Sequence, residues 1–136
     1  MSQTLSFGLN QIILPESRFE DFIDLLVKSG VSNLEIRNDL PIKMIDPKNT
    51  EFIREIVKSR DMKILSINAL QKFNLWSKER EQELMEMCKF ASESEIEGIV
   101  LVPLNDGTIV DNKTQKELLQ SSLKSIINIL DDYNLM

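Results

Sequence analysis

The chain has 136 residues, of which 42% are hydrophobic and 28% are charged, which is enough for one globular domain of ordinary size. Its formal net charge is −6 and its Lys and Arg residues are scattered singly, so we expect no nucleic-acid partner. No apolar run approaches the roughly 20 residues that span a bilayer, and the N-terminus lacks the pattern of a secretory signal, so we expect no membrane partner. A single cysteine cannot form an internal disulfide, which favours a reducing, cytoplasmic setting.

The sequence contains no histidine. This excludes Ser-His-Asp and Cys-His nucleophile systems and every His-ligated metal site from this chain. Chemistry performed by the chain alone would have to use carboxylates, Lys, Tyr or the thiol of Cys88. Because Cys88 falls on an apolar helical stripe, it is expected to be a small buried hydrophobic residue.

Four short apolar runs predict β-strands, since each is rich in Ile, Leu or Val and is bounded by polar or turn residues. They are residues 5–13, 33–37, 63–70 and 98–104. Between these strands, apolar residues recur at helical spacing and predict four helices. The first covers residues 18–29, the second runs from residue 47 or 50 to 60, the third starts after Ser77 and the fourth starts at Thr114.

Capping patterns mark the predicted helix ends. Ser17 with Glu20, and Thr114 with Glu117, match the S/T-x-x-E capping box, while Asp46 before a proline suits an N-cap. The glycine at position 30 and the asparagine at position 134 suit the left-handed residue that follows a helix. The side chains expected to face the core are Phe19, Phe22, Ile23 and Leu26, then Phe52, Ile53, Ile56 and Val57, then Leu84, Met87, Cys88 and Ala91, and last Leu119, Leu123, Ile126, Ile127 and Leu130.

Strands that alternate with helices predict an α/β fold with parallel pairing. Two architectures remain open: a flavodoxin-like open sheet, and a (β/α)8 barrel, for which four units are half of the complete fold. An open sheet buries both faces, so its strands should be apolar throughout, yet Leu34 and Ile36 alternate with Glu35 and Arg37. We therefore expect residues 1–136 to form a single domain, the N-terminal half of a TIM barrel, with strands in the order 1-2-3-4.

Polar side chains recur at the carboxyl ends of the predicted strands, where a TIM barrel has its active-site mouth. They are Asn10, Glu35, Arg37 and Asn68. The alternative is a solvated strand face, or an ion pair between Glu35 and Arg37.

Three segments, "LEIRND", "ILSINALQKFN" and "VLVPL", occur in the order and at the spacing of a known family. The chain resembles the sugar phosphate isomerase/epimerase superfamily of xylose-isomerase-like TIM barrels, and most closely its inosose (2-keto-myo-inositol) isomerase group. The resemblance covers the whole chain but only the first half of the family barrel. It implies that Asn10, Glu35, Arg37 and Asn68, with Phe73, Asn74 and Trp76 of the following loop, line a substrate cavity.

The resemblance also implies a divalent metal in the full-length family and proton transfer through an enediolate on a sugar or inositol-derived ketone. The family places its metal ligands on strands five to eight, so no catalytic residue and no metal ligand is assigned in this chain. We expect this chain to be truncated or to need a partner, to be inactive as an enzyme when alone, and to self-associate through exposed sheet edges. The alternative is a complete, non-enzymatic α/β module that binds a small molecule or a protein.

Overall fold

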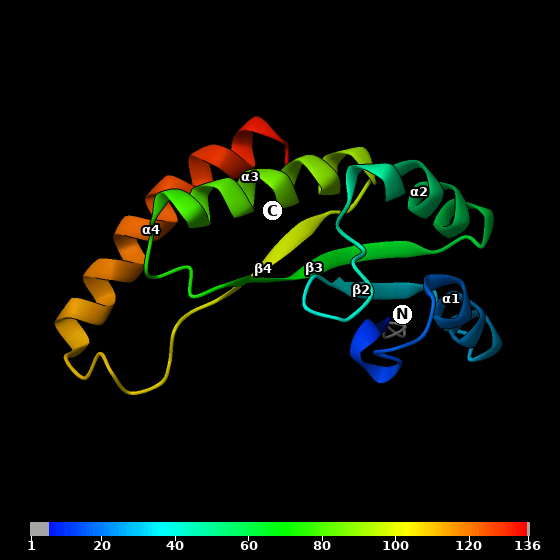
Figure 1. Cartoon of the computed structure of the whole chain (residues 1–136), viewed down its shortest axis with the longest axis horizontal. Coiled ribbons are helices and arrows are strands. Elements are labelled where there is room, and N and C mark those ends of the chain that lie inside the picture. The colour runs from blue at the N-terminus through cyan, green and yellow to red at the C-terminus, as the bar shows by residue number, and fades with distance from the viewer. Residues whose placement is uncertain (1–5, 136) are drawn as a thin grey trace, which may run out of the picture.

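The chain folds into four successive βα units, shown in Figure 1. The computed structural model describes residues 6–135. The strands are β1 (Gly8–Asn10), β2 (Asn33–Arg37), β3 (Lys63–Gln71) and β4 (Gly98–Val102). The α-helices are α1 (Phe19–Lys28), α2 (Thr50–Ser59), α3 (Lys78–Glu93) and α4 (Asn112–Asp132), and short 3-10 turns form η1 (Gln11–Ile13) and η2 (Pro47–Asn49).

All three strand pairings are parallel, and the strand order is β1-β2-β3-β4. Helices α2, α3 and α4 arch over one side of the strands in Figure 1, and one core cluster joins the sheet to all four α-helices. Helices on one face and a sequential strand order are the arrangement of a barrel, because a flavodoxin-like sheet changes strand order and carries helices on both faces. The predicted half-barrel fold is confirmed, and the open-sheet alternative is wrong.

The first strand is shorter than the sequence predicts. It ends at Asn10, whose side-chain Oδ1 accepts a hydrogen bond of 2.8 Å from the backbone N–H of Ile12 and turns the chain into η1. Residue 5 of the predicted strand lies outside the described residues. Gly8 lets β1 approach β2 closely, since a Cβ atom added there would lie 3.0 Å from the carbonyl oxygen of Asn33.

A β-bulge in β3 changes which side chains face the helices. The register with β2 shifts so that Leu34 pairs with Ile64 while Glu35 pairs with Ser66, which skips Leu65. Unbroken alternation along residues 63–70 would place Leu65 on the same side as Ile67 and Ile64 on the same side as Ser66, and the structure shows the opposite for Leu65 and Ile64. Ile64 is buried and Leu65 is 38% exposed, because the extra residue reverses the alternation at this point.

Two of the predicted helix caps are wrong. Helix α1 begins after Arg18, which makes no side-chain capping bond, and Ser17 lies one residue outside the cap. Helix α4 begins after Asp111, whose Oδ2 accepts a 2.7 Å bond from the backbone N–H of Thr114. The Asp carboxylate therefore takes the capping role that the sequence analysis assigned to Thr114.

The other cap predictions are confirmed. Asp46 accepts a bond from the N–H of Lys48 ahead of η2. Helix α3 begins after Ser77 as predicted, and Ser77 also caps it by accepting from the N–H of Arg80. Gly30 and Asn134 follow α1 and α4 with φ angles of 69° and 53°, in the left-handed region.

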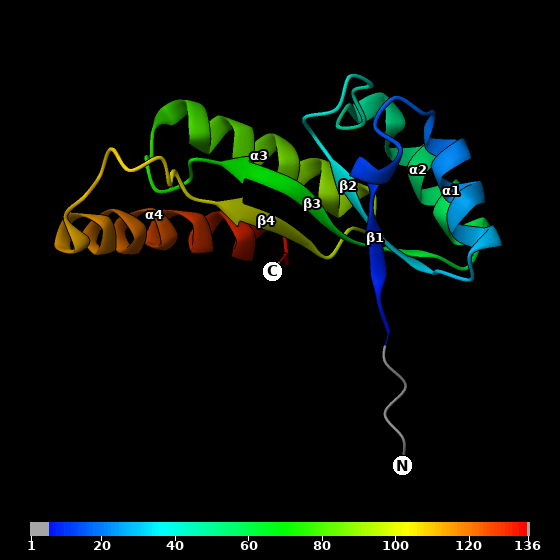
Figure 2. The ribbon, with the colours of Figure 1, turned by 90° about the horizontal axis from the view of Figure 1, so that it is seen from below.

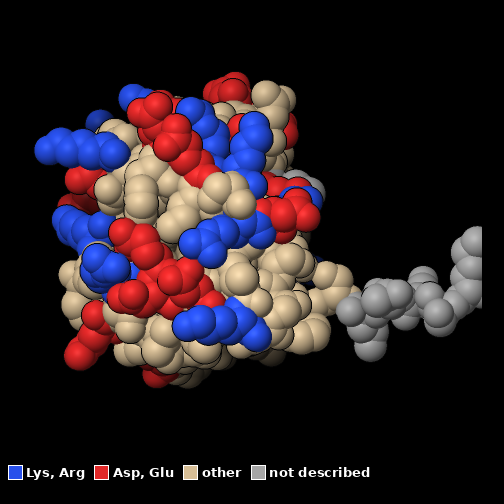
Figure 3. All heavy atoms as spheres, turned by 90° about the vertical axis from the view of Figure 1, so that its right-hand side faces the viewer, with Lys and Arg blue, Asp and Glu red and all other residues tan. Residues whose placement is uncertain are grey.

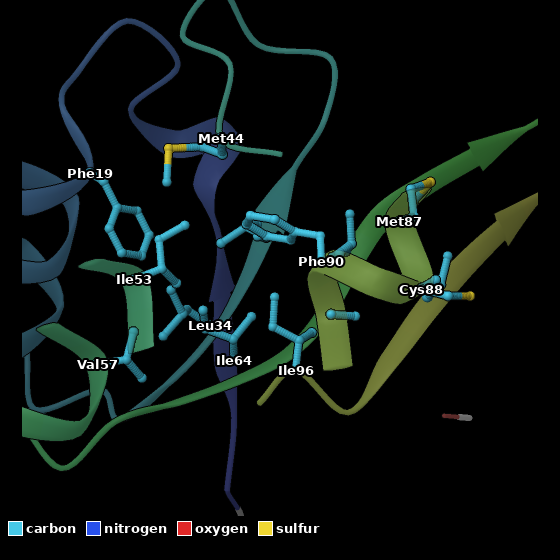
Figure 4. Packing of buried hydrophobic residues seen from close by; sticks show 14 of the residues in the cluster. Phe19, Leu34, Met44, Ile53, Val57, Ile64, Met87, Cys88, Phe90 and Ile96 are labelled. Atoms are coloured by element: carbon cyan, nitrogen blue, oxygen red, sulfur yellow. The ribbon is translucent and has the colours of Figure 1, made fainter. Parts of the chain in front are cut away.

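The core lies between the sheet and the helices (Figure 4). Ile53 and Val57 of α2 face the core, as predicted from the apolar stripe of this helix, and they pack near Leu34 and Ile64. Phe90 of α3 lies close by. Three residues predicted to face the core are instead exposed: Phe52, Leu123 and Ile127. Helix α4 buries Ile126 fully, and its Leu119 and Leu130 pack partly buried against the core, so the stripe predicted for this helix is covered except at Leu123 and Ile127.

The outer helical surface carries both signs of charge. On the face shown in Figure 3, Lys and Arg side chains lie among Asp and Glu side chains. Within residues 6–135, no helix is long and apolar enough to cross a membrane.

The bulge gives a sharp stability test. Replacing Ile64 by Ala should lower the free energy of unfolding by about 2–5 kcal/mol, since it leaves a cavity in the core. The neighbouring Leu65→Ala change should cost less than half as much, because Leu65 is already partly exposed. Urea unfolding of the two variants measures both values, and a larger cost at Leu65 would contradict the observed register.

The thiol of Cys88 is buried, and burial raises its pKa from an ordinary 9.0 to about 12. At pH 8 roughly one thiol in ten thousand is then ionised, so the native protein should react very slowly with Ellman's reagent. The same protein in 6 M guanidinium chloride, roughly the strength needed to unfold stable domains, serves as the control and should react at once. Rapid reaction of the native protein would show that the α3 packing is open.

Candidate functional site

The carboxylate of Glu35 lies at the centre of a polar cluster on the face of the sheet opposite the core. Three side chains donate hydrogen bonds to it: Asn10 from β1, and Ser66 and Asn68 from β3. The Ser66 Oγ–Glu35 Oε2 distance is 2.5 Å and the Asn68 Nδ2–Glu35 Oε1 distance is 3.1 Å, and Asn10 Nδ2 also donates to Oε1. These four residues, on three adjacent strands, form what we term the Glu35 cluster.

The local sequence explains why these side chains meet. In the parallel register Asn10 pairs with Glu35, and Glu35 pairs with Ser66, so the three stand side by side across the sheet. The bulge at Leu65 places Ser66 in this row. A shallow depression of about 230 Å³ opens beside the cluster and is lined by Gly8, Leu9, Asn10, Leu34, Glu35, Leu65 and Ser66.

Arg37, two residues further along β2, pairs with Asp39 and not with Glu35. Its guanidinium donates two parallel bonds, of 2.7 Å from Nε and 2.5 Å from Nη2, to the two carboxylate oxygens of Asp39. The alternative of a Glu35–Arg37 ion pair is therefore wrong. The bidentate bond lowers the pKa of Asp39 and raises the pKa of Arg37. The negative charge of Glu35 also raises the pKa of Arg37, but by less.

Two side-chain amides, one buried and one half-buried, hold this end of the sheet in place. Gln11 is 1% exposed, and its Oε1 accepts a 3.1 Å bond from the backbone N–H of Arg37. Asn38 bonds to both the N–H and the C=O of Ala69, at 2.8 and 3.1 Å, where the register of β3 shifts a second time. These bonds fix the strand ends from which Glu35 and Asn68 project.

The structure brings four of the seven predicted site residues to one face, namely Asn10, Glu35, Arg37 and Asn68. The three loop residues lie deeper. Phe73 is buried in the core, and Trp76 packs against the core from its edge. Asn74 is buried as well, and its Oδ1 accepts a 2.6 Å hydrogen bond from the backbone N–H of Leu104. Their contact with a substrate stays a prediction, and their observed bonds and packing hold the loop after β3.

Sequence reasoning missed two members of this surface. Ser66 alternates with Asn68 on the polar side of β3, so it carried the same period-2 signal as the residues that were chosen, but it does not lie at the carboxyl end of the predicted strand. Asp39 lies past the end of the predicted second strand, where alternation no longer applies.

The carboxylates on this face do not fit a metal ion. Glu35 already accepts bonds from three side chains, and Asp39 is held by Arg37. Among residues 6–135, no three His, Cys, Asp or Glu side chains are grouped closely enough to hold one. No step through a metal is therefore derived from these residues.

The Arg37–Asp39 pair predicts a pH dependence. Since the pKa of Asp39 is lowered on folding, its stabilising effect is full above the ordinary value of 3.8 and is lost as the pH falls through the lower native pKa. In Arg37→Gln the Asp39 titration should return towards 3.8, while the exposed control Arg18→Gln should leave it unchanged. Carbon-13 NMR of the carboxyl group measures the midpoint, and a wild-type midpoint at or above 3.8 would contradict the pairing.

Solved structures provide the comparison for this arrangement; no protein-family model and no curated protein matches the chain. A xylose isomerase domain-containing protein from Salmonella typhimurium LT2 is 27% identical with a TM-score of 0.84, over 96% of this chain and 47% of that one. The IolI protein with a bound zinc atom is 21% identical with a TM-score of 0.85, over 96% and 49%. A D-tagatose 3-epimerase-like protein is 16% identical with a TM-score of 0.70, over 96% and 51%.

The chain spans about half the length of these solved structures. Identities below 25% establish shared fold alone, and the four parallel strands in sequential order agree with it. The resemblance drawn from the three sequence segments is confirmed at this level. The chain has the fold of the N-terminal half of a xylose-isomerase-like TIM barrel.

Proposed function

We propose that this chain forms the first half of the substrate-binding mouth of a sugar or inosose isomerase or epimerase, and that it performs no catalysis alone. The observation that carries the proposal is the Glu35 carboxylate, held by three side-chain donors on the uncovered face of the sheet. On a strand face that is only exposed to water, a carboxylate would not need three side-chain donors to fix its orientation. The fold similarity to isomerase-like and epimerase-like barrels supports the class of reaction.

The hydrogen-bonding capacity of Glu35 suits a polyhydroxy ligand. A carboxylate offers about four lone-pair positions, and the three observed donors leave one for a ligand hydroxyl. The donors fix the carboxylate, so a ligand hydroxyl meets an acceptor that is already oriented. A ketose or an inositol-derived ketone presents several adjacent hydroxyl groups and is the substrate class that we propose.

Metal binding and proton transfer belong, in this proposal, to the part of the barrel beyond these four units. The zinc atom in the IolI structure supports a metal in the full-length family. The role of Glu35 is to bind and orient a hydroxyl group, and no catalytic residue is assigned here. The cytoplasmic setting, the lack of nucleic-acid and membrane partners, and association through the sheet edges belong to the same proposal.

Titration of the nitrogen-15-labelled chain with 2-keto-myo-inositol or D-tagatose tests this function. Amide shifts should concentrate at the ends of β1, β2 and β3, and Glu35→Gln should weaken binding about tenfold, the loss of one charge-assisted hydrogen bond. Glu51→Gln, on the outer side of α2, is the matched control and should bind normally.

Equal binding by Glu35→Gln and the wild type, with a circular dichroism spectrum that shows both folded, would contradict the assignment of Glu35. A separate assay with added zinc tests inactivity. Metal-dependent isomerisation by the purified 136-residue chain would overturn the statement that it performs no catalysis alone.

A further inference from the structure

Arg37 stands at the carboxyl end of β2, on the same face of the sheet as Glu35. Figure 2 shows β2 between β1 and β3, so both strands that flank this position belong to the four units described here. Arginine binds phosphate and carboxylate groups through two parallel hydrogen bonds. Whether the guanidinium of Arg37 is free or occupied therefore affects which ligands this part of the mouth accepts.

Asp39 occupies the donors that an anionic ligand would use. Its two carboxylate oxygens accept hydrogen bonds from Nε and Nη2 of Arg37, at 2.7 and 2.5 Å. A phosphate group would need the same two parallel donors, so it cannot bind there while Asp39 does. These hydrogen bonds raise the pKa of Arg37 and lower the pKa of Asp39, so at neutral pH both groups are charged and the pair has no net charge.

An uncharged ligand can still bind beside this pair. A guanidinium has five N–H donors, and two of those on Arg37 point to Asp39, which leaves three without a partner within residues 6–135. These three can donate to a hydroxyl or carbonyl oxygen. Among the described residues that line the depression of about 230 Å³, only Glu35 is charged, and its carboxylate accepts from a hydroxyl but repels an anion.

We propose that Asp39 determines specificity: by holding the guanidinium of Arg37, it makes this half of the mouth select uncharged polyhydroxy ketones and reject their phosphate esters. A phosphate ester carries nearly two negative charges at neutral pH. It would meet the charge of Glu35 without gaining the paired donors of Arg37. The inference rests on the proposed function and narrows the substrate class of the same mouth.

Titration of the nitrogen-15-labelled chain with D-tagatose and with D-tagatose 6-phosphate tests the role of Asp39. The wild type should bind the phosphate ester at least about tenfold more weakly than the free sugar, because like charges repel. Asp39→Asn removes the charge that neutralises Arg37 and should tighten binding of the ester at least about tenfold. Adding Arg37→Gln to this variant should abolish the gain, because the gain comes from the released guanidinium.

Asp24→Asn is the matched control. The Asp24 side chain is 50% exposed, close to the 46% of Asp39, and it also pairs with an arginine, Arg60, at 3.3 Å. This pair joins α1 to the residue after α2, so the variant removes the same charge on the helical side of the sheet. The ratio of the two dissociation constants should equal that of the wild type.

A phosphate ester that binds the wild type as tightly as the free sugar would overturn the inference. An unchanged ratio in Asp39→Asn would overturn it as well, and binding of D-tagatose to the wild type would show that the proposed function survives either result. The amide spectra of the same titrations report whether each variant is folded.

Failure of both sugars to bind the wild type would count against the proposed function, and inorganic phosphate then tests Asp39 separately. Phosphate should shift the nitrogen-15 resonance of Arg37 Nε in Asp39→Asn and leave it in place in the wild type. An equal response of the two proteins would overturn the role of Asp39, whatever the sugars do.

Discussion

Parallel pairing of the four strands in chain order is the constraint on which the rest of the structure depends. Each parallel connection needs a crossover of one handedness, and when successive strands are also neighbours, every crossover helix falls on the same face. One side of the sheet thus receives the whole hydrophobic core, which joins α1, α2, α3 and α4. The other side is left free to carry polar side chains.

The Glu35 cluster follows from this asymmetry. A carboxylate on a sheet face between two neighbouring strands needs hydrogen-bond donors from those strands, and the register supplies Asn10 on one side and Ser66 with Asn68 on the other. The bulge at Leu65 aligns Ser66 with Glu35. The same bulge turns Ile64 into the core, so one extra residue serves both the packing and the polar site.

The sequence predicted the elements and their order because hydrophobic periodicity and chain order carry that information directly. It also placed Asn10, Glu35, Arg37 and Asn68 on one face, since alternation in β2 is unbroken. It failed at Leu65, because a bulge depends on pairing with β2 and leaves no local sequence pattern.

Other details failed for similar reasons. The partner of Arg37 was not foreseen, because Asp39 lies past the strand where alternation no longer applies. The exposure of Ile127 was not foreseen either, since a helical stripe shows which residues are apolar and leaves open what covers them. Periodicity thus predicts which face of a helix or strand is apolar, while the residues that contact that face depend on the tertiary arrangement.

Amide hydrogen exchange at β3 tests most directly the central claim that the strands pair in chain order, with β3 between β2 and β4. If they do, the N–H groups of Lys63–Gln71 should exchange much more slowly than those of the loop between β4 and α4. Exchange of the β3 amides at the rate of that loop would contradict the claim.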